Sequence, residues 1–185
     1  MGEKYTHISE AQISFIERQH IFFVATAMED GRVNLSPKGM DSLRVLGPNR
    51  VAWLNVTGSG NETAAHTQQN DRMTIMFCAF NGPPMILRLY GHARMELPHD
   101  EQWQELTALF APLPGARQIF EIDVDLVHTS CGFGVPFFEF VGDRLQLNAW
   151  AERKGESGIR SYWQEKNVIS LDGMPIPIAE ERQRA

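Results

Sequence analysis

The turn TGSGNET, residues 57–63, carries residue types that could bind an anion. Ser59 and Glu62 have the S-x-x-E spacing of a capping box, which predicts a helix that points its free backbone N–H groups at the turn. Gly58 and Gly60 allow positive φ and the close approach of a ligand. The side-chain donors of the turn are Thr57, Ser59, Asn61 and Thr63. The turn is either a phosphate cradle or an ordinary capped loop, and it is not a P-loop because G-x-x-x-x-G-K-[ST] is absent.

Four further side chains each allow two interpretations. Lys38 is either the counter-charge of a phosphate or a solvated surface lysine, and His66 either faces a ligand or is solvated. Arg88 lies in the apolar run ILRLY, so we expect a ligand anion or a carboxylate beside it, because an unpaired buried charge is costly. Cys131 is either a thiol near a ligand or a packed structural thiol. The histidines lack H-x-H, H-E-x-x-H or facial-triad spacing, which predicts no metal site.

Composition narrows the class of protein. The chain has 185 residues, 43% of them hydrophobic, which favours one domain with one substantial core. A net charge of −6 argues against nucleic acid as a partner. No apolar stretch is long enough to span a membrane and no secretory h-region is visible, so we expect no membrane association. Two distant cysteines suit a reducing compartment, and a cytoplasmic location is predicted.

Periodicity and turn signals predict short strands with brief helices between them. Helices are expected over residues 9–20, 60–69, 100–110 and 157–166, the first with a capping box at Ser9 and Gln12. Strands are expected over residues 21–28, 32–36, 43–46, 50–56, 72–80, 85–97 and 118–127, with a bend at Gly91. Residues 137–141 and 145–148 are predicted to form a hairpin around Gly142. This order of elements favours a mostly antiparallel barrel over a parallel sheet with crossover helices.

Four segments of the chain resemble the pyridoxamine-5′-phosphate oxidase-like, FMN-binding split-barrel family: RVNLSPKG, RVAWLNVTGSGNETAAH, NDRMTIMF and ILRLYGHARM. The resemblance covers most of the chain from Ile8 to about Val141. It implies a mostly β protein with short helices, built as a six-stranded antiparallel split β-barrel, and a homodimer with FMN in grooves at the interface. The prediction is thus a single domain over residues 1–185, with a core over 8–141 and a C-terminal hairpin and helix extension over 142–185.

The resemblance also implies which residues hold the cofactor. The family's groove corresponds to Asn34–Lys38, Trp53–Thr57 and Ser59–Thr63, with Lys38 as a phosphate-binding lysine. The cofactor-binding residues expected are Ser36, Lys38, Asn55, Thr57, Ser59, Gly60, Asn61, Thr63, His66 and Arg88. The chain departs from the oxidases where they resemble S-R-K, because it has Asn61-Glu62-Thr63 there.

Other departures bear on the reaction. Ile86 replaces a flavin-contacting glutamine, and the W-x-x-G…R-L-H-x-R segment that grips pyridoxal phosphate is missing, which disfavours pyridoxamine phosphate oxidation. The function implied is an FMN-dependent oxidoreductase that acts on an unknown small-molecule substrate. A non-catalytic flavin-binding dimer and a split barrel that binds haem are the alternatives. No nicotinamide fingerprint identifies an electron donor.

Overall fold

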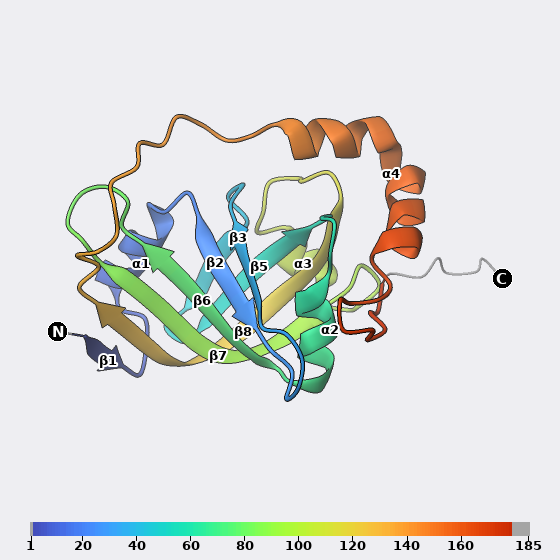
Figure 1. Ribbon diagram of the computed structural model, residues 1–185. Helices are drawn as coiled ribbons and strands as arrows, with labels where there is room; N and C mark the ends of the chain where they lie inside the picture. Colours follow the sequence, from blue (N-terminus) through green and yellow to red (C-terminus); the bar gives the residue numbers. More distant parts are fainter. Residues whose placement is uncertain (1, 179–185) are drawn as a thin grey trace.

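The computed structural model describes residues 2–178, and β-strands dominate it (Figure 1). The strands are β1 (Glu3–Tyr5), β2 (Phe22–Thr26), β3 (Asn34–Lys38), β4 (Leu43–Gly47), β5 (Arg50–Val56), β6 (Arg72–Cys78), β7 (Ile86–Glu96) and β8 (Ala116–Ser130). The helices are α1 (Glu10–Glu17), α2 (Glu62–Gln69), α3 (Trp103–Thr107) and α4 (Gln146–Lys166). Strand positions are rich in Val, Ile and Phe, which pack well on a pleated surface.

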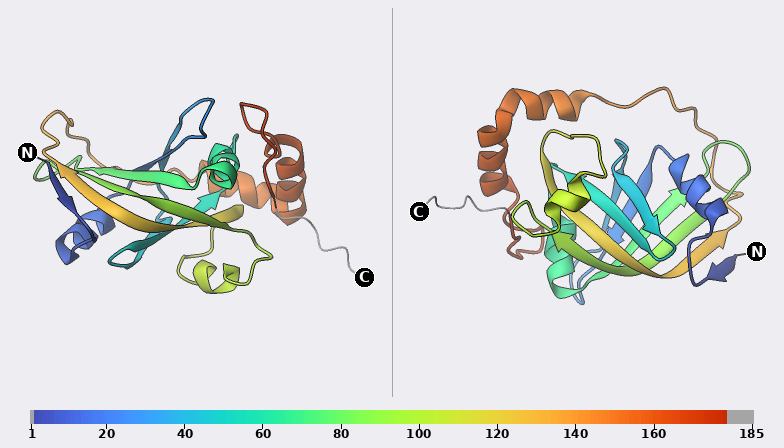
Figure 2. Two further views of the ribbon diagram at one scale, coloured as in Figure 1. Left: turned by 90° about the horizontal axis from the view of Figure 1, so that it is seen from below. Right: turned by 180° about the vertical axis from the view of Figure 1, so that it is seen from behind.

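All strand pairs are antiparallel and belong to one sheet in the order β3-β2-β6-β7-β8-β5-β4, with β1 paired to β8. The sheet curls but does not close, because the end strands β3 and β4 are not hydrogen-bonded to each other. Two further views show the open curl of the sheet (Figure 2). The predicted split barrel is confirmed, and the short strands β1 and β4 extend it.

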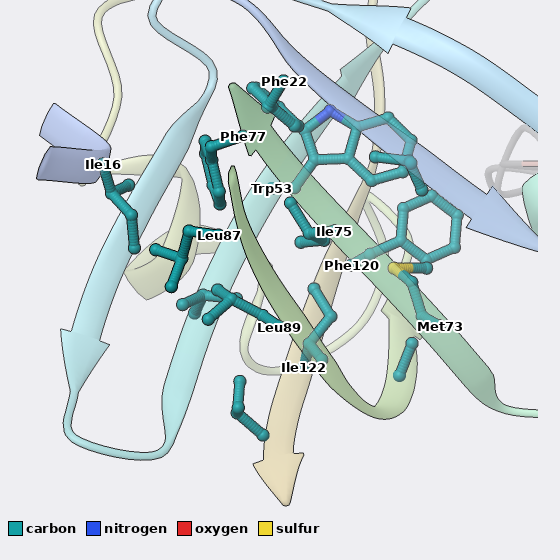
Figure 3. Packing of buried hydrophobic residues seen from close by; sticks show 14 of the residues in the cluster. Ile16, Phe22, Trp53, Met73, Ile75, Phe77, Leu87, Leu89, Phe120 and Ile122 are labelled. Carbon is teal, nitrogen blue, oxygen red and sulfur yellow. The ribbon is translucent and has the colours of Figure 1, made fainter. Parts of the chain in front are cut away.

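One face of the curled sheet encloses the larger hydrophobic core. Its side chains alternate along each strand with outward-facing ones, as Leu87 and Leu89 do on β7. Trp53 of β5 stacks on Phe120 of β8, with ring centroids 5.0 Å apart, and Phe22 of β2 meets the same indole edge-on (Figure 3). The ammonium group of Lys38, at the end of β3, lies over the Trp53 ring of this aromatic cluster.

The long strand β7 bends where the sequence predicts. Its pairing with β8 shifts register between Tyr90 and Gly91. A Cβ atom on Gly91 would lie 2.1 Å from the carbonyl oxygen of Asp123, so only glycine allows the strands to approach this closely.

The two helix-start predictions have different outcomes. At α1 the capping box is confirmed, since the Ser9 amide donates to Gln12 Oε1 at 2.8 Å and the Gln12 amide donates to Ser9 Oγ at 3.4 Å. At α2 the capping box is wrong. Asn61 is the N-cap residue there, without a side-chain cap, and Glu62 instead accepts hydrogen bonds from the Leu171 amide at 3.1 and 3.2 Å.

The C-terminal extension differs from the prediction. The hairpin around Gly142 is absent, because residues 131–145 form neither helix nor strand and α4 begins at Gln146. The predicted helix over 157–166 is the second half of α4, which kinks at Gly155, where φ is 66°. The predicted helix over 100–110 is reduced to α3. Residues 179–185 of the extension lie outside the described residues.

Within residues 2–178, no helix is long and apolar enough to cross a membrane. No group of three or more His, Cys, Asp or Glu side chains in that range is arranged to hold a metal ion.

Candidate functional site

A row of polar side chains points into the barrel from the edge strand β3. Asn34, Ser36 and Lys38 alternate with exposed residues and lie opposite inward-facing residues of β2. Asn34 Nδ2 donates to Thr63 Oγ1 at 3.1 Å, which links the start of the row to the first turn of α2. The edge strand thereby brings Ser36, Lys38 and Thr63, all predicted as site residues, to one mouth of the barrel.

Lys38 is the cation of this row, and it is half-buried. Its Nζ lies 4.9 Å from the centroid of the Trp53 ring, across the opening between β3 and β5. Burial, and secondarily the positive charge of Arg117, lower the pKa of Lys38 to about 8. This partial burial favours the interpretation of Lys38 as a counter-charge over that of a solvated surface lysine.

Arg117 is a second cation at this mouth, and it is 3% exposed. Its guanidinium donates to Asn167 Oδ1 at 2.6 Å, to the Gly60 carbonyl at 3.2 Å and to Gln118 Oε1 at 3.1 Å. Among residues 2–178 no carboxylate forms an ion pair with it. Burial lowers the pKa of Arg117 to about 10.

The sequence reasoning missed Arg117. The signal that singled out Arg88, a cation in a strand of apolar residues, also exists in ARQIFEI at the start of β8. What the sequence lacks is any sign that residues 60 and 167 converge on this guanidinium, since those contacts span 57 and 50 residues of chain.

The TGSGN turn is held in place by hydrogen bonds to the chain just before β8 and to the C-terminal extension. Asn167, the completely buried C-cap residue of α4, donates through Nδ2 to the Gly58 carbonyl at 3.2 Å. Thr57 Oγ1 donates to the Gly115 carbonyl at 2.8 Å and accepts a hydrogen bond from Trp163 Nε1 at 2.7 Å. Thr57 is thus a framework residue, whereas Ser59 and Gly60 are exposed at the tip of the turn.

His66 and Asn55 lie deeper in the barrel than the turn. His66 is 1% exposed and its Nδ1 lies 3.1 Å from Thr26 Oγ1, so the solvated interpretation of this histidine is wrong. Asn55 Nδ2 donates to Gln118 Oε1 at 2.9 Å. Asn55 lies on the core face of β5 and His66 on the inner face of α2, so both line the inner side of the mouth.

Arg88 does not join this group. It lies on the outer face of the sheet, because Leu87 and Leu89 on either side of it are in the core. Its Nη1 donates to Ser130 Oγ at 3.1 Å. Cys131 follows Ser130 directly after the end of β8 and is exposed, so it is not a packed structural thiol.

Several buried polar atoms at the mouth have no hydrogen-bond partner among the described residues. They are Ser36 Oγ, Gln118 Nε2 and both amide atoms of Asn61. Buried polar groups are normally satisfied, so orphaned ones mark a place where a ligand or water completes the bonding. The site thus offers three free donors, on Ser36, Asn61 and Gln118, and two cations that form no ion pair with a carboxylate of the described chain. This set fits an anion with several oxygen acceptors, such as a phosphate ester.

Comparison with known proteins places the chain in a family. The model of the pyridoxamine 5′-phosphate oxidase family matches residues 8–131. The chain belongs to this family. A pyridoxamine 5′-phosphate oxidase family protein of Aspergillus flavus, ustO, is 35% identical over 191 residues, a match that covers 92% of this chain and 76% of the fungal protein.

Two solved structures are similar in fold to about two thirds of this chain. HupZ of Group A Streptococcus has a TM-score of 0.51 at 20% identity, covering 64% of this chain and 91% of HupZ. An FAD-binding protein of Mycobacterium smegmatis has a TM-score of 0.51 at 12% identity, covering 68% of this chain and 97% of that protein. These similarities concern the fold alone.

Proposed function

We propose that the protein is an FMN-dependent oxidoreductase that works as a homodimer on a small-molecule substrate. The observation that carries the proposal is the pair of cations, Lys38 and Arg117, beside the orphaned donors at the barrel mouth. Membership of the pyridoxamine 5′-phosphate oxidase family and the FAD-binding structural neighbour support a flavin as the ligand.

The residues of the mouth would hold the flavin phosphate. Lys38 and Arg117 supply its counter-charge, and the free donors of Ser36, Asn61 and Gln118 are available to its oxygens. Two cations and a cluster of donors offset the loss of the Arg-Lys pair that the family's oxidases carry in the turn. Bound FMN supplies the hydride and electron chemistry, while the protein supplies binding, orientation and exclusion of water.

The outer face of the sheet supports a dimer built on the barrel strands. Met76, Ile86, Tyr90 and Leu126 are half-exposed on that face, although they belong to central strands. A second copy would cover these side chains and complete the flavin groove. Light scattering tests the dimer. A monomer at micromolar concentration with flavin still bound would contradict it.

The experiment that tests the function is the visible spectrum of the purified protein, followed by mass spectrometry of the released cofactor. FMN is the expected cofactor, and a haem spectrum or a colourless protein that takes up no added FMN would overturn the proposal. Oxidation of NADH or NADPH by the flavin-loaded protein would then distinguish an enzyme from a non-catalytic flavin-binding dimer.

A further inference from the structure

Residues 131–145, which we call the strap, run from the end of β8 to the start of α4 without helix or strand. Figure 1 shows the strap as an orange length of chain that arches over one side of the barrel. The match to the family model ends at residue 131, so nearly all of the strap lies outside the matched residues. The match to the Aspergillus flavus protein covers 92% of the chain and therefore extends well beyond residue 131.

The strap is aromatic and touches the barrel at two points. Phe140 stacks on His20, with ring centroids 3.7 Å apart and planes 5° from parallel. Phe138 packs against Phe80 with centroids 5.4 Å apart, and its amide donates to the Phe80 carbonyl at 3.0 Å. Two aromatic pairs therefore fix the strap over the ends of β2, β3 and β6.

A cavity of about 900 Å³ lies between the strap and the barrel. Its walls include both aromatic pairs, together with Phe23 and Pro37 from the outer side of the sheet. Its volume falls in the range of sites for small organic ligands, roughly 300–1,000 Å³. Lys38 lines this cavity as well as the phosphate site, so the two sites adjoin.

The charges of the cavity favour an acid. Arg18, Arg144 and Lys38 line it, and none of them forms an ion pair within the described residues. Two carboxylates, Glu139 and Asp143, line it too, so they equal the two arginines in number, and Lys38 is shared with the phosphate site. Aromatic walls beside two arginines that form no ion pair within the described residues complement a planar aromatic molecule that bears one anionic group.

We propose that the pocket under the strap is the substrate pocket, and that its substrate class is aromatic acids. This inference rests on the proposed function, because the pocket is assigned to the substrate only if the adjoining site holds the flavin. It also assigns a role to the strap, which is to provide the wall that selects the substrate.

The test is a calorimetric titration of the full chain, with and without FMN, using 2-naphthoate and its uncharged analogue 2-naphthalenemethanol as probes. Naphthoate should bind more tightly than the alcohol. Phe140→Ala should weaken both probes about three- to tenfold, because it removes a stacking wall. Arg144→Gln should weaken only naphthoate, by about two- to fivefold, as expected for an exposed ion pair.

Two matched controls separate the pocket from a general apolar surface. Phe133 lies on the same strap but is 81% exposed and outside the pocket lining, so Phe133→Ala should leave both affinities unchanged. Arg153 is exposed on α4 outside the pocket lining, so Arg153→Gln should do the same. Equal losses in the Phe133 and Phe140 variants would overturn the proposal.

Three further outcomes distinguish failure of the substrate-pocket proposal from failure of the flavin proposal. If Phe140→Ala lowers the mass measured by light scattering and leaves naphthoate binding intact, a second copy occupies the pocket and the proposal fails. If naphthoate does not bind the FMN-loaded protein, the substrate pocket fails while the flavin proposal stands. If naphthoate binds as expected but no FMN is taken up, the proposed function fails and the pocket remains an aromatic-acid site.

Discussion

Two buried charged residues of β8, Arg117 and Glu121, lie four residues apart and differ in their partners. Glu121, whose side chain is 1% exposed, is clasped by two arginines, Arg50 of β5 and Arg94 of β7. Burial alone would raise the pKa of Glu121, but the hydrogen bonds and charges of these arginines lower it instead. Arg117 is buried to a similar degree, yet only neutral oxygens of the described chain accept its hydrogen bonds.

The difference indicates which charge serves the fold and which serves a ligand. A buried ion whose partners come from the same chain is complete, whereas a buried cation without an anion is a cost that the fold bears. Arg117 is moreover close enough to Lys38 to lower its pKa, which adds repulsion to that cost. An anionic ligand would relieve both, so the mouth of the barrel has the electrostatics of a binding site and the Glu121 cluster that of a structural one.

The largest effect is expected from Glu121→Gln. The variant keeps the shape of the side chain and removes its charge, so charge-assisted hydrogen bonds from Arg50 and Arg94 are weakened. Removing one partner of a buried ion pair is strongly destabilising, but these arginines are 47% and 57% exposed and can return to water, which moderates the loss. We therefore expect the free energy of unfolding to fall by about 2–4 kcal/mol. Urea titration at pH 7 measures it. Glu152→Gln, an exposed change on α4, is the control and should stay within about 0.5 kcal/mol of wild type.

The same variant gives a pH test of the structural cluster. The pKa of Glu121 in the folded protein lies below its ordinary value of 4.5, so its contribution is fully present above that value. It is lost as the pH falls through the lowered pKa. The stability difference between wild type and Glu121→Gln should therefore be constant near neutrality and shrink in acid. A difference that grows in acid would contradict the assigned ion pairs.

Arg117→Met should cost less stability than Glu121→Gln. The change relieves an uncompensated buried charge but leaves the Gly60 carbonyl and Asn167 with lost hydrogen bonds, so the net loss should stay below about 1.5 kcal/mol. Inorganic phosphate should raise the Tm of the cofactor-free wild type and not that of the variant. The exposed control Arg153→Met should respond to phosphate like wild type. Equal phosphate stabilisation of Arg117→Met would remove Arg117 from the anion site.

A smaller effect concerns pH and Lys38. Since the pKa of Lys38 is lowered to about 8 in the free protein, FMN should bind less tightly as the pH rises through that value, with a slope approaching tenfold per pH unit. Lys38→Arg keeps the charge at high pH, and FMN titrations between pH 7 and 9.5 should lose this slope. A slope that survives in the arginine variant would come from another group.

The smallest effect is expected at Cys131. The thiol is exposed and follows the outer end of β8, away from the charged mouth. Cys131→Ser should therefore leave the flavin content of the purified protein unchanged. A folded variant with less flavin would show that the thiol belongs to the binding groove.

Local patterns in the sequence predicted much of the fold. Strand β5 has the predicted bounds, Arg50–Val56, and the Gly91 bend and the first capping box are present. These features depend on neighbouring residues or on steric needs of one strand pair. The capping box at Ser59 and Glu62 failed because a distant backbone amide, that of Leu171, binds the Glu62 carboxylate.

The same distinction applies to the site. The prediction of Lys38, Asn61 and Thr63 as site residues came from the family resemblance of their segments. Arg117 could not be predicted, because its significance arises from burial and from contacts with Gly60 and Asn167 that no local spacing encodes. The strap was mistaken for a hairpin because its aromatic residues, which are typical of strands, are instead exposed and packed singly against the barrel.

The most direct test of the central claim is a paired titration of FMN and riboflavin, which lacks the phosphate, against wild type, Lys38→Ala and Arg117→Met. A charge-assisted hydrogen bond is worth roughly 1.5–3 kcal/mol, so each variant should weaken FMN about ten- to a hundredfold. Riboflavin should change by less than about twofold, because neither cation is proposed to bind the ring. Equal losses for FMN and riboflavin, or no loss for either, would contradict the assignment of these two cations to the phosphate.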